Sequence, residues 1–140
     1  MKQYLLDSGF LYGYIDASDQ HHEAISAIFA EMKLPIILPV PAITEIAYFI
    51  KRNLGLRALA DFLTELPKTN FILETTHPSD LVRSAEILRK YNDVNIDFVD
   101  ACIVAMAERL NITKILTVDR RHFSIFKPEH CASFEIYHKL

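Results

Sequence analysis

Short runs of apolar residues alternate along the chain with longer stretches in which apolar residues recur every three or four positions. A short apolar run is typical of a strand buried in a sheet. Such runs occupy residues 4–6, 36–38, 71–73 and 115–118, and residues 134–137 form a further run near the end. The pattern therefore predicts four buried strands and a last strand close to the C-terminus.

The stretches between these runs have the periodicity of helices. We expect helices over residues 10–15, 21–32, 41–50, 56–66, 78–91 and 97–110. Pro41 suits a first helical turn, and Gly55 interrupts the apolar pattern between two neighbouring helices. The helix over 78–91 is expected to bury Leu81, Ala85 and Leu88.

Strands that alternate with helices indicate right-handed crossovers and a mainly parallel sheet with helices on both faces. The helix over 97–110 is apolar almost all round as far as Glu108, which predicts a deeply packed position. No linker-like stretch divides the chain. The sequence therefore predicts one α/β domain over residues 1–140.

Composition is that of an ordinary globular protein, with 51% hydrophobic and 24% charged residues. No apolar run approaches the roughly 18 residues that span a bilayer, and the N-terminus does not resemble a signal peptide. Cys102 and Cys131 form no metal or disulfide pattern and are interpreted as small buried or partly buried side chains. We expect a cytoplasmic protein without a membrane segment.

The net charge of −3 argues against a protein that coats nucleic acid irrespective of sequence. Four of the acids, however, have positions that suggest a shared site. Setting them aside leaves 14 acids against 15 basic residues, so a local cleft for nucleic acid stays compatible with the composition.

These four acids stand where the active sites of parallel sheets are found. Asp7 and Asp119 each follow a predicted strand directly, while Glu45 and Asp100 lie in the first turns of predicted helices. Active sites in open α/β sheets gather beyond the carboxyl ends of the strands. We therefore expect all four side chains to face one edge of the sheet.

Each acid also has an ordinary structural interpretation. Asp7 and Asp97 suit helix N-caps, and Asp100 then occupies the third helical position, where an acid favours the helix N-terminus. Asp119 suits a turn, and Glu45 suits an exposed helix face. The surroundings of Asp100 are the most informative, because an unpaired carboxylate in so apolar a helix is costly.

Clustered carboxylates raise one another's pKa values, and a divalent cation relieves that repulsion. Oxygen ligands without histidine or cysteine at metal-binding spacing favour Mg²⁺ or Mn²⁺ over zinc. Such an ion suits phosphodiester hydrolysis, because it polarises a phosphoryl oxygen and helps to generate hydroxide. The four acids thus predict a hydrolase acting on a phosphate ester.

With these acids in place, the sequence resembles the PIN-domain ribonucleases, most closely the VapC-type toxins of prokaryotic toxin–antitoxin pairs. The matching segments are YLLDSG at residues 4–9, TE at 44–45, DFVDACIVA at 97–105 and LTVDRRHF at 116–123. They appear in the family's order and span nearly the whole chain. The two later segments are the more specific.

The resemblance implies an α/β/α sandwich and an acidic metal site built from Asp7, Glu45, Asp100 and Asp119. It also implies that Asp97 is an accessory acid at the metal. Thr117 is implied to shape the end of a strand. One or two Mg²⁺ or Mn²⁺ ions, an RNA substrate, an antitoxin partner and a homodimer are further implications.

Basic residues near the predicted site are candidates for contacts with the RNA backbone. Lys51 and Arg52 come after Glu45 in the same helical region, and Arg120 and Arg121 follow Asp119. Phosphate contacts of this kind position a nucleic acid. A solvated charged loop explains the same residues equally well.

The aromatic stretch that contains Phe10, Tyr12 and Tyr14 has two interpretations. Aromatic side chains at this spacing usually belong to the core. They also suit a surface for a second copy or for an antitoxin.

Two other functions compete with a ribonuclease. A catalytically silent PIN-like module that binds RNA or a protein would have the same fold. A phosphoacceptor or phosphatase domain is less compatible, because Gly9 breaks the D-x-D pattern that starts at Asp7, and Glu74 at the end of the third strand is no phosphoacceptor aspartate.

Overall fold

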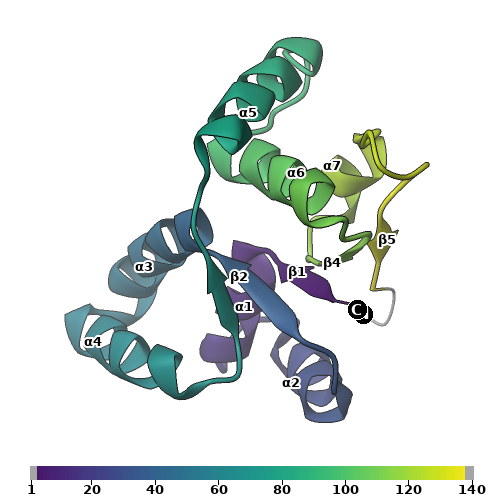
Figure 1. Cartoon of the computed structure of the whole chain (residues 1–140). Coiled ribbons are helices and arrows are strands. Elements are labelled where there is room, and N and C mark those ends of the chain that lie inside the picture. Colours follow the sequence, from purple (N-terminus) through teal and green to yellow (C-terminus); the bar gives the residue numbers. More distant parts are fainter. Residues whose placement is uncertain (1–2, 138–140) are drawn as a thin grey trace.

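The sheet runs through the centre of the molecule and consists of five parallel strands in the order β3-β2-β1-β4-β5 (Figure 1). The computed structural model describes residues 3–137. The strands are β1 (Tyr4–Leu6), β2 (Ile36–Pro39), β3 (Ile72–Glu74), β4 (Lys114–Leu116) and β5 (Glu135–Ile136). The prediction of a mainly parallel sheet is confirmed.

Helices cover both faces of this sheet, as Figure 1 shows. One face carries α1 (Ser8–Ile15), α2 (His22–Glu31), α3 (Val40–Leu54), α4 (Leu56–Glu65) and the 3₁₀ turn η1 (Leu66–Lys68). The other carries α5 (Pro78–Lys90), α6 (Phe98–Leu110) and α7 (Arg120–Ile125). The architecture is the three-layer α/β/α sandwich that the resemblance implied.

Alternation of side chains along the strands produces two separate cores. Leu5 pairs in register with Ile37 on β2 and Ile115 on β4, and all three pack against α6. Leu6 points the opposite way and packs with Leu38 among the helices of the other face. Successive strand residues face opposite sides, so buried runs of three residues serve both layers at once.

Most predicted elements are present, and α7 is the clear omission. No helix was predicted after Asp119, and a charged loop was one of two interpretations of residues 120 and 121, whereas these residues open this six-residue helix. Asp119 is its N-cap and accepts a hydrogen bond from His122 N at 3.1 Å. A helix this short offers too few residues for apolar periodicity to be visible. Gly55 separates α3 from α4 as predicted, with a φ of 94° that favours glycine.

The buried face of α5 differs from the prediction. Leu81, predicted to lie inside, is 53% exposed, while Asp80, Ser84 and Ile87 are buried. The reason is an ion pair: Arg109 of α6 donates from Nε and Nη2 to the two carboxylate oxygens of Asp80, at 2.9 Å each. Pairing a buried carboxylate in this way sets the rotation of the helix, and apolar periodicity does not reveal it.

Arg109 also joins β3 to the same network. Its Nη1 donates to Glu74 Oε1 at 2.9 Å. Burial opposes ionisation of Asp80, yet hydrogen bonds from Arg109 and His77 N outweigh it and lower the pKa of Asp80. One guanidinium therefore connects α6 to the end of β3 and the start of α5.

The cysteine prediction is confirmed, since Cys102 is buried and Cys131 partly buried, both as free thiols. Within residues 3–137, every helix is too short or too polar to cross a lipid bilayer.

Replacing Arg109 by Met is expected to lower the free energy of unfolding by about 2–4 kcal/mol, because the buried Asp80 carboxylate loses its partner. Urea denaturation measures the change. Lys68→Met is the control: it breaks an exposed pair with Glu65 and should cost less than about 0.5 kcal/mol. Equal stability losses in the two variants would contradict the structural role of Arg109.

Candidate active site

The sheet order reverses between β1 and β4, and Asp7 lies at the carboxyl end of β1 beside this reversal. Chain crossovers leave to opposite sides here, which opens a crevice beyond the strand ends. Asp7 N donates to Leu116 O of β4 at 2.9 Å. The backbone at Asp7 is therefore held directly to the neighbouring strand.

The Asp7 carboxylate is fixed by two donors. Ser8 N donates to Oδ1 and Thr117 Oγ1 donates to Oδ2, both at 2.8 Å. The side chain is buried, and burial raises the pKa of Asp7 to about 6 although both hydrogen bonds act in the opposite direction. The charges of Glu45 and Asp119 raise this pKa further. Asp7 is thus both the N-cap of α1 and a member of an acidic group.

Thr117 connects Asp7 to Asp119. Its Oγ1, which donates to Asp7, also accepts a hydrogen bond from Asp119 N at 2.9 Å. The Asp119 carboxylate accepts a hydrogen bond from His122 N at 3.1 Å, and His122 Nδ1 lies 2.7 Å from Asp119 Oδ2. The implication that Thr117 shapes the strand end agrees with this geometry.

Asp97 is the N-cap of α6, as one interpretation of the sequence expected, and Asp97 and Asp100 in addition cap this helix reciprocally. Asp100 N donates to Asp97 Oδ1 at 3.0 Å, and Asp97 N donates to Asp100 Oδ2 at 3.1 Å. Capping does not account for the whole environment. Burial, together with the charges of Asp97 and Asp7, raises the pKa of Asp100 to about 8. Asp100 therefore caps a helix and also faces Asp7 across the strand ends.

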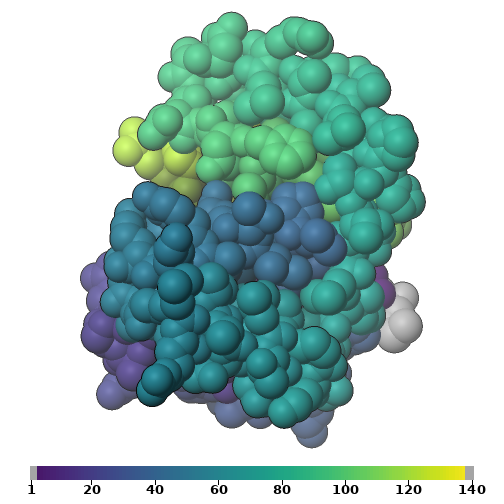
Figure 2. All heavy atoms as spheres, turned by 90° about the vertical axis from the view of Figure 1, so that its left-hand side faces the viewer, coloured from purple at the N-terminus to yellow at the C-terminus, as the bar shows by residue number. Residues whose placement is uncertain are grey.

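Glu45 joins the group from the first turns of α3. Ser8 Oγ donates to its carboxylate and so connects α3 to the start of α1. Burial and the nearby charge of Asp97 raise the pKa of Glu45. In Figure 2, α3 in blue lies directly beside α6 in green, and these two helices are in contact. Ser8 was not predicted; its only sequence signal is a small donor directly after the strand-end acid.

The structure thus brings the five predicted acids to one sheet edge, the acidic edge, where charge interactions connect them: Asp7, Glu45, Asp97, Asp100 and Asp119. The donor chemistry and the excess negative charge fit a hard divalent cation. Within residues 3–137, no three acidic, histidine or cysteine side chains are already arranged around one metal position. The acidic edge therefore fits Mg²⁺ or Mn²⁺ in charge and ligand type, and ligation requires its side chains to draw closer.

The four predicted basic residues have different environments. Lys51 and Arg52 lie exposed in the last turn of α3, and Arg121 lies exposed in the first turn of α7. Arg120 is partly buried, and its Nη2 donates to Tyr137 O at 3.4 Å. Arg120 is therefore tied to the end of the chain by its guanidinium, whereas Arg52, although exposed, lies over the rings of Tyr48 and Phe49.

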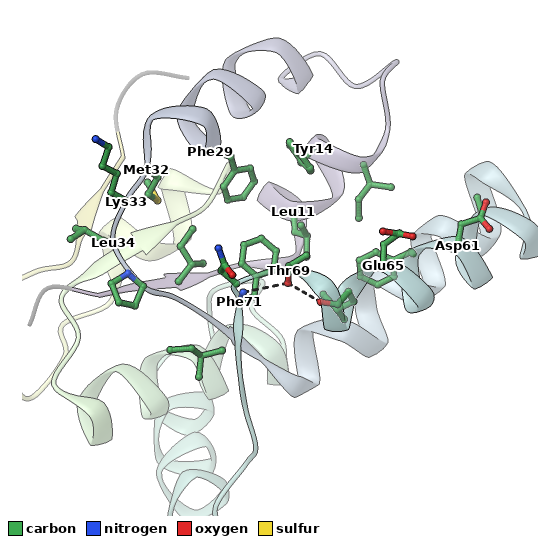
Figure 3. A pocket seen from close by; sticks show the side chains of 18 of the residues that line it. Leu11, Tyr14, Phe29, Met32, Lys33, Leu34, Asp61, Glu65, Thr69 and Phe71 are labelled. Atoms are coloured by element: carbon green, nitrogen blue, oxygen red, sulfur yellow. Dashed lines mark hydrogen bonds between the residues drawn. The ribbon is translucent and has the colours of Figure 1, made fainter.

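An apolar groove of about 1000 Å³ lies away from the acidic edge, bordered by α1, α2, α4 and the amino-terminal ends of β2 and β3 (Figure 3). Tyr14 and Phe29 line it, with ring centroids 5.0 Å apart, and the ring of Phe71 lies 5.8 Å from that of Phe29. The aromatic stretch of α1 therefore divides: Phe10 belongs to the core, whereas Tyr14 is 45% exposed in the groove.

The raised pKa values give the metal-free protein a predictable pH dependence. Folded Asp7 and Asp100 keep their protons to about pH 6 and 8, whereas in the unfolded chain they lose them near 3.8. Their contribution to stability is complete below that value and is lost as pH rises through 6 and then 8. With EDTA present, we expect the free energy of unfolding to fall between pH 5 and 8.

In Asp100→Asn the free energy of unfolding should fall less over this pH range than in the parent protein, and the two falls should differ by about 1–3 kcal/mol. Urea denaturation at the two pH values measures the difference, with Asp93→Asn in an exposed turn as the control. Identical pH dependence in Asp100→Asn and the parent protein would contradict the environment described for Asp100.

Comparison with known proteins assigns this chain to a family. The PIN domain family model matches residues 4–127. Ribonuclease VapC26 of Mycobacterium tuberculosis is 30% identical over 124 residues, which cover 89% of this chain and 92% of that protein.

Solved structures show the same fold at lower identity. VapC20 of M. tuberculosis, described as a sarcin–ricin loop cleaving toxin, has a TM-score of 0.75 at 19% identity over 80% of this chain and 86% of its own. DNA-bound VapBC from Salmonella typhimurium has a TM-score of 0.67 at 13% identity over 98% of each chain. The chain therefore belongs to the PIN-domain family, with VapC-type proteins as its relatives.

Proposed function

We propose that this protein is a metal-dependent endoribonuclease that hydrolyses RNA phosphodiester bonds and acts as the toxin of a VapBC-type pair. The observation that carries the proposal is the acidic edge, where Asp7 and Asp100 come from segments far apart in sequence and yet the charge of Asp7 raises the pKa of Asp100. A relative named as a ribonuclease, with 30% identity, supports the assignment.

Asp7, Glu45, Asp100 and Asp119 are the residues that would hold Mg²⁺ or Mn²⁺. The ion would polarise a phosphoryl oxygen and lower the pKa of water bound to it. Hydrogen bonds from Ser8 N and Thr117 Oγ1 orient Asp7, and the contact with His122 orients Asp119. Partners of this kind set the direction of ligand oxygens.

Asp97 contributes through its neighbours. Its reciprocal bonds with Asp100 fix that carboxylate at the start of α6, and its charge acts on Glu45. Its role as a metal ligand stays a prediction. Exposed Lys51, Arg52 and Arg121 are candidates for RNA phosphate contacts.

Asp100→Asn and Asp7→Asn are expected to lower Mn²⁺-dependent RNA cleavage by more than about 100-fold, because each removes a negative ligand while keeping the shape of the side chain. Cleavage of a labelled RNA pool is measured with Mn²⁺ and again with EDTA. Asp93→Asn is the control and should cleave like the parent protein.

Normal cleavage by Asp100→Asn, with its fold intact by circular dichroism, would overturn the site assignment. A parent protein that binds RNA but never hydrolyses it, over a range of substrates and metals, would favour the alternative of a catalytically silent module.

The apolar groove is the surface that we assign to the antitoxin. Solved relatives include toxin–antitoxin complexes, among them VapBC2 from Rickettsia felis with a TM-score of 0.69. The groove is lined mainly by apolar side chains of α1, α2 and α4, such as Phe29, Ala58 and Phe62. An apolar helix face fits such a groove. Because the groove is separate from the acidic edge, a further segment of the antitoxin, beyond the helix that fills the groove, would have to extend to the acids in order to block them.

The test co-expresses the tagged chain with the gene that neighbours its own. We expect the encoded protein to co-purify and to suppress RNA cleavage. Ala58→Glu, which places a charge in the groove, should abolish both effects, whereas Ala60→Glu on the exposed side of the same helix should retain them. Full inhibition of Ala58→Glu would contradict the groove assignment.

The homodimer and the cytoplasmic location stay predictions. Exposed apolar side chains on β3 and α5, including Ile72, Leu73, Leu81 and Val82, support a contact between two copies along this edge.

A further inference from the structure

Two strongly exposed aromatic rings stand beside the acidic edge. Tyr48 is 61% exposed and lies one helical turn after Glu45 on α3. Phe98 is 42% exposed and is the first residue of α6, directly after Asp97. Within residues 3–137 three aromatic side chains are exposed to this degree, and the third, Tyr14, lines the apolar groove.

The position of Tyr48 follows from helix geometry. Side chains three residues apart on a helix have Cβ atoms about 5–6 Å apart on one face. The Tyr48 side chain therefore leaves α3 on the same face as Glu45, and its ring is exposed to solvent. Phe98 follows Asp97 directly in the sequence, and its exposed ring stands at the start of the neighbouring helix α6.

Arg52 gives the Tyr48 ring a fixed neighbour. Its guanidinium carbon lies 5.5 Å from the centroid of Tyr48 and 5.1 Å from that of Phe49. The rings of Tyr48 and Phe49 lie 5.6 Å apart at 65°. A planar cation and an exposed ring thus form one surface, which we call the Tyr48 platform (Tyr48, Phe49 and Arg52).

The acids of the acidic edge repel the phosphates of RNA, so contacts with uncharged parts of the RNA are needed to hold it there. Five acids face the region that a scissile phosphate must enter, and the chain has a net charge of −3. Nucleobases are neutral, so their stacking on a ring is not opposed by these charges. Stacking on aromatic side chains tolerates any base and requires that the base be unpaired.

We propose that the Tyr48 platform and Phe98 stack unpaired bases of single-stranded RNA beside the phosphate that enters the acidic edge. The proposal rests on the ribonuclease function and adds the residues that position the substrate, which has to be a single strand or a loop because stacking requires unpaired bases. Tyr48 and Phe98 are positioning residues that hold the substrate through its bases. A protein partner is less favoured at these rings, because the apolar groove lies elsewhere.

The test measures binding of a single-stranded 12-nucleotide RNA of mixed sequence that carries 2-aminopurine at each position in turn. All measurements use Mg²⁺ and the Asp100→Asn background, so that the RNA stays intact, and Asp100→Asn alone is the parent in this experiment. Fluorescence of 2-aminopurine falls when the base stacks. We expect quenching at one or two positions and weaker binding of the same RNA in a duplex.

Adding Tyr48→Leu should weaken binding by about 5- to 100-fold and remove the quenching at one position. Phe98→Leu should act in the same way at another position. Tyr48→Phe keeps the ring and should bind within about twofold of the parent, as should Tyr14→Leu, the exposed-aromatic control outside the acidic edge.

Parent-like binding and quenching by Tyr48→Leu, with the fold intact, would overturn the Tyr48 platform. Equal affinity for duplex and single strand would overturn the substrate class. Failure of the ribonuclease function gives a different result. The protein with Asp100 intact would then show no Mn²⁺-dependent cleavage, while the ring variants would still lose RNA binding.

Discussion

Electrostatic repulsion among carboxylates at the carboxyl ends of β1 and β4 is the constraint on which the account depends. The sheet reversal opens space there, and burial of Asp7 and Asp100 raises both pKa values toward neutrality. Hydrogen bonds from Ser8 and Thr117 hold Asp7 in place despite that cost. A fold that buries acids in this way is less stable without metal, and functional sites commonly lower the stability of the protein around them.

The rest of the molecule separates two tasks in space. Helices α3 and α6 and strands β1 and β4 place the acidic edge and its flanking rings, whereas α1, α2 and α4 form the apolar groove toward the other end of the strands. The antitoxin that we propose for this groove would therefore be anchored without its anchoring contacts occupying the acidic edge. The Arg109 network has a third role, because it fixes α5 and β3 at the exposed edge of the sheet.

Local signals carried most of the fold and the acids of the site. Buried apolar runs predicted the strands and helical spacing predicted most helices, and the position of Asp97 before an apolar helix indicated the N-cap that the structure contains. The predicted burial of Leu81 was wrong, because an ion pair between Asp80 and Arg109, which are distant in sequence, sets the rotation of α5. The contact of Ser8 with Glu45 and the exposure of Tyr48 also depend on tertiary packing, which no local pattern encodes.

A crystal structure of the protein soaked in Mn²⁺, with anomalous diffraction to locate the metal, tests the central claim most directly. The account predicts a manganese peak at the acidic edge bonded to carboxylate oxygens of Asp7 and Asp100, with Glu45 or Asp119 drawn toward it. Manganese bound elsewhere, with both Asp7 and Asp100 free of metal at saturating concentration, would contradict it.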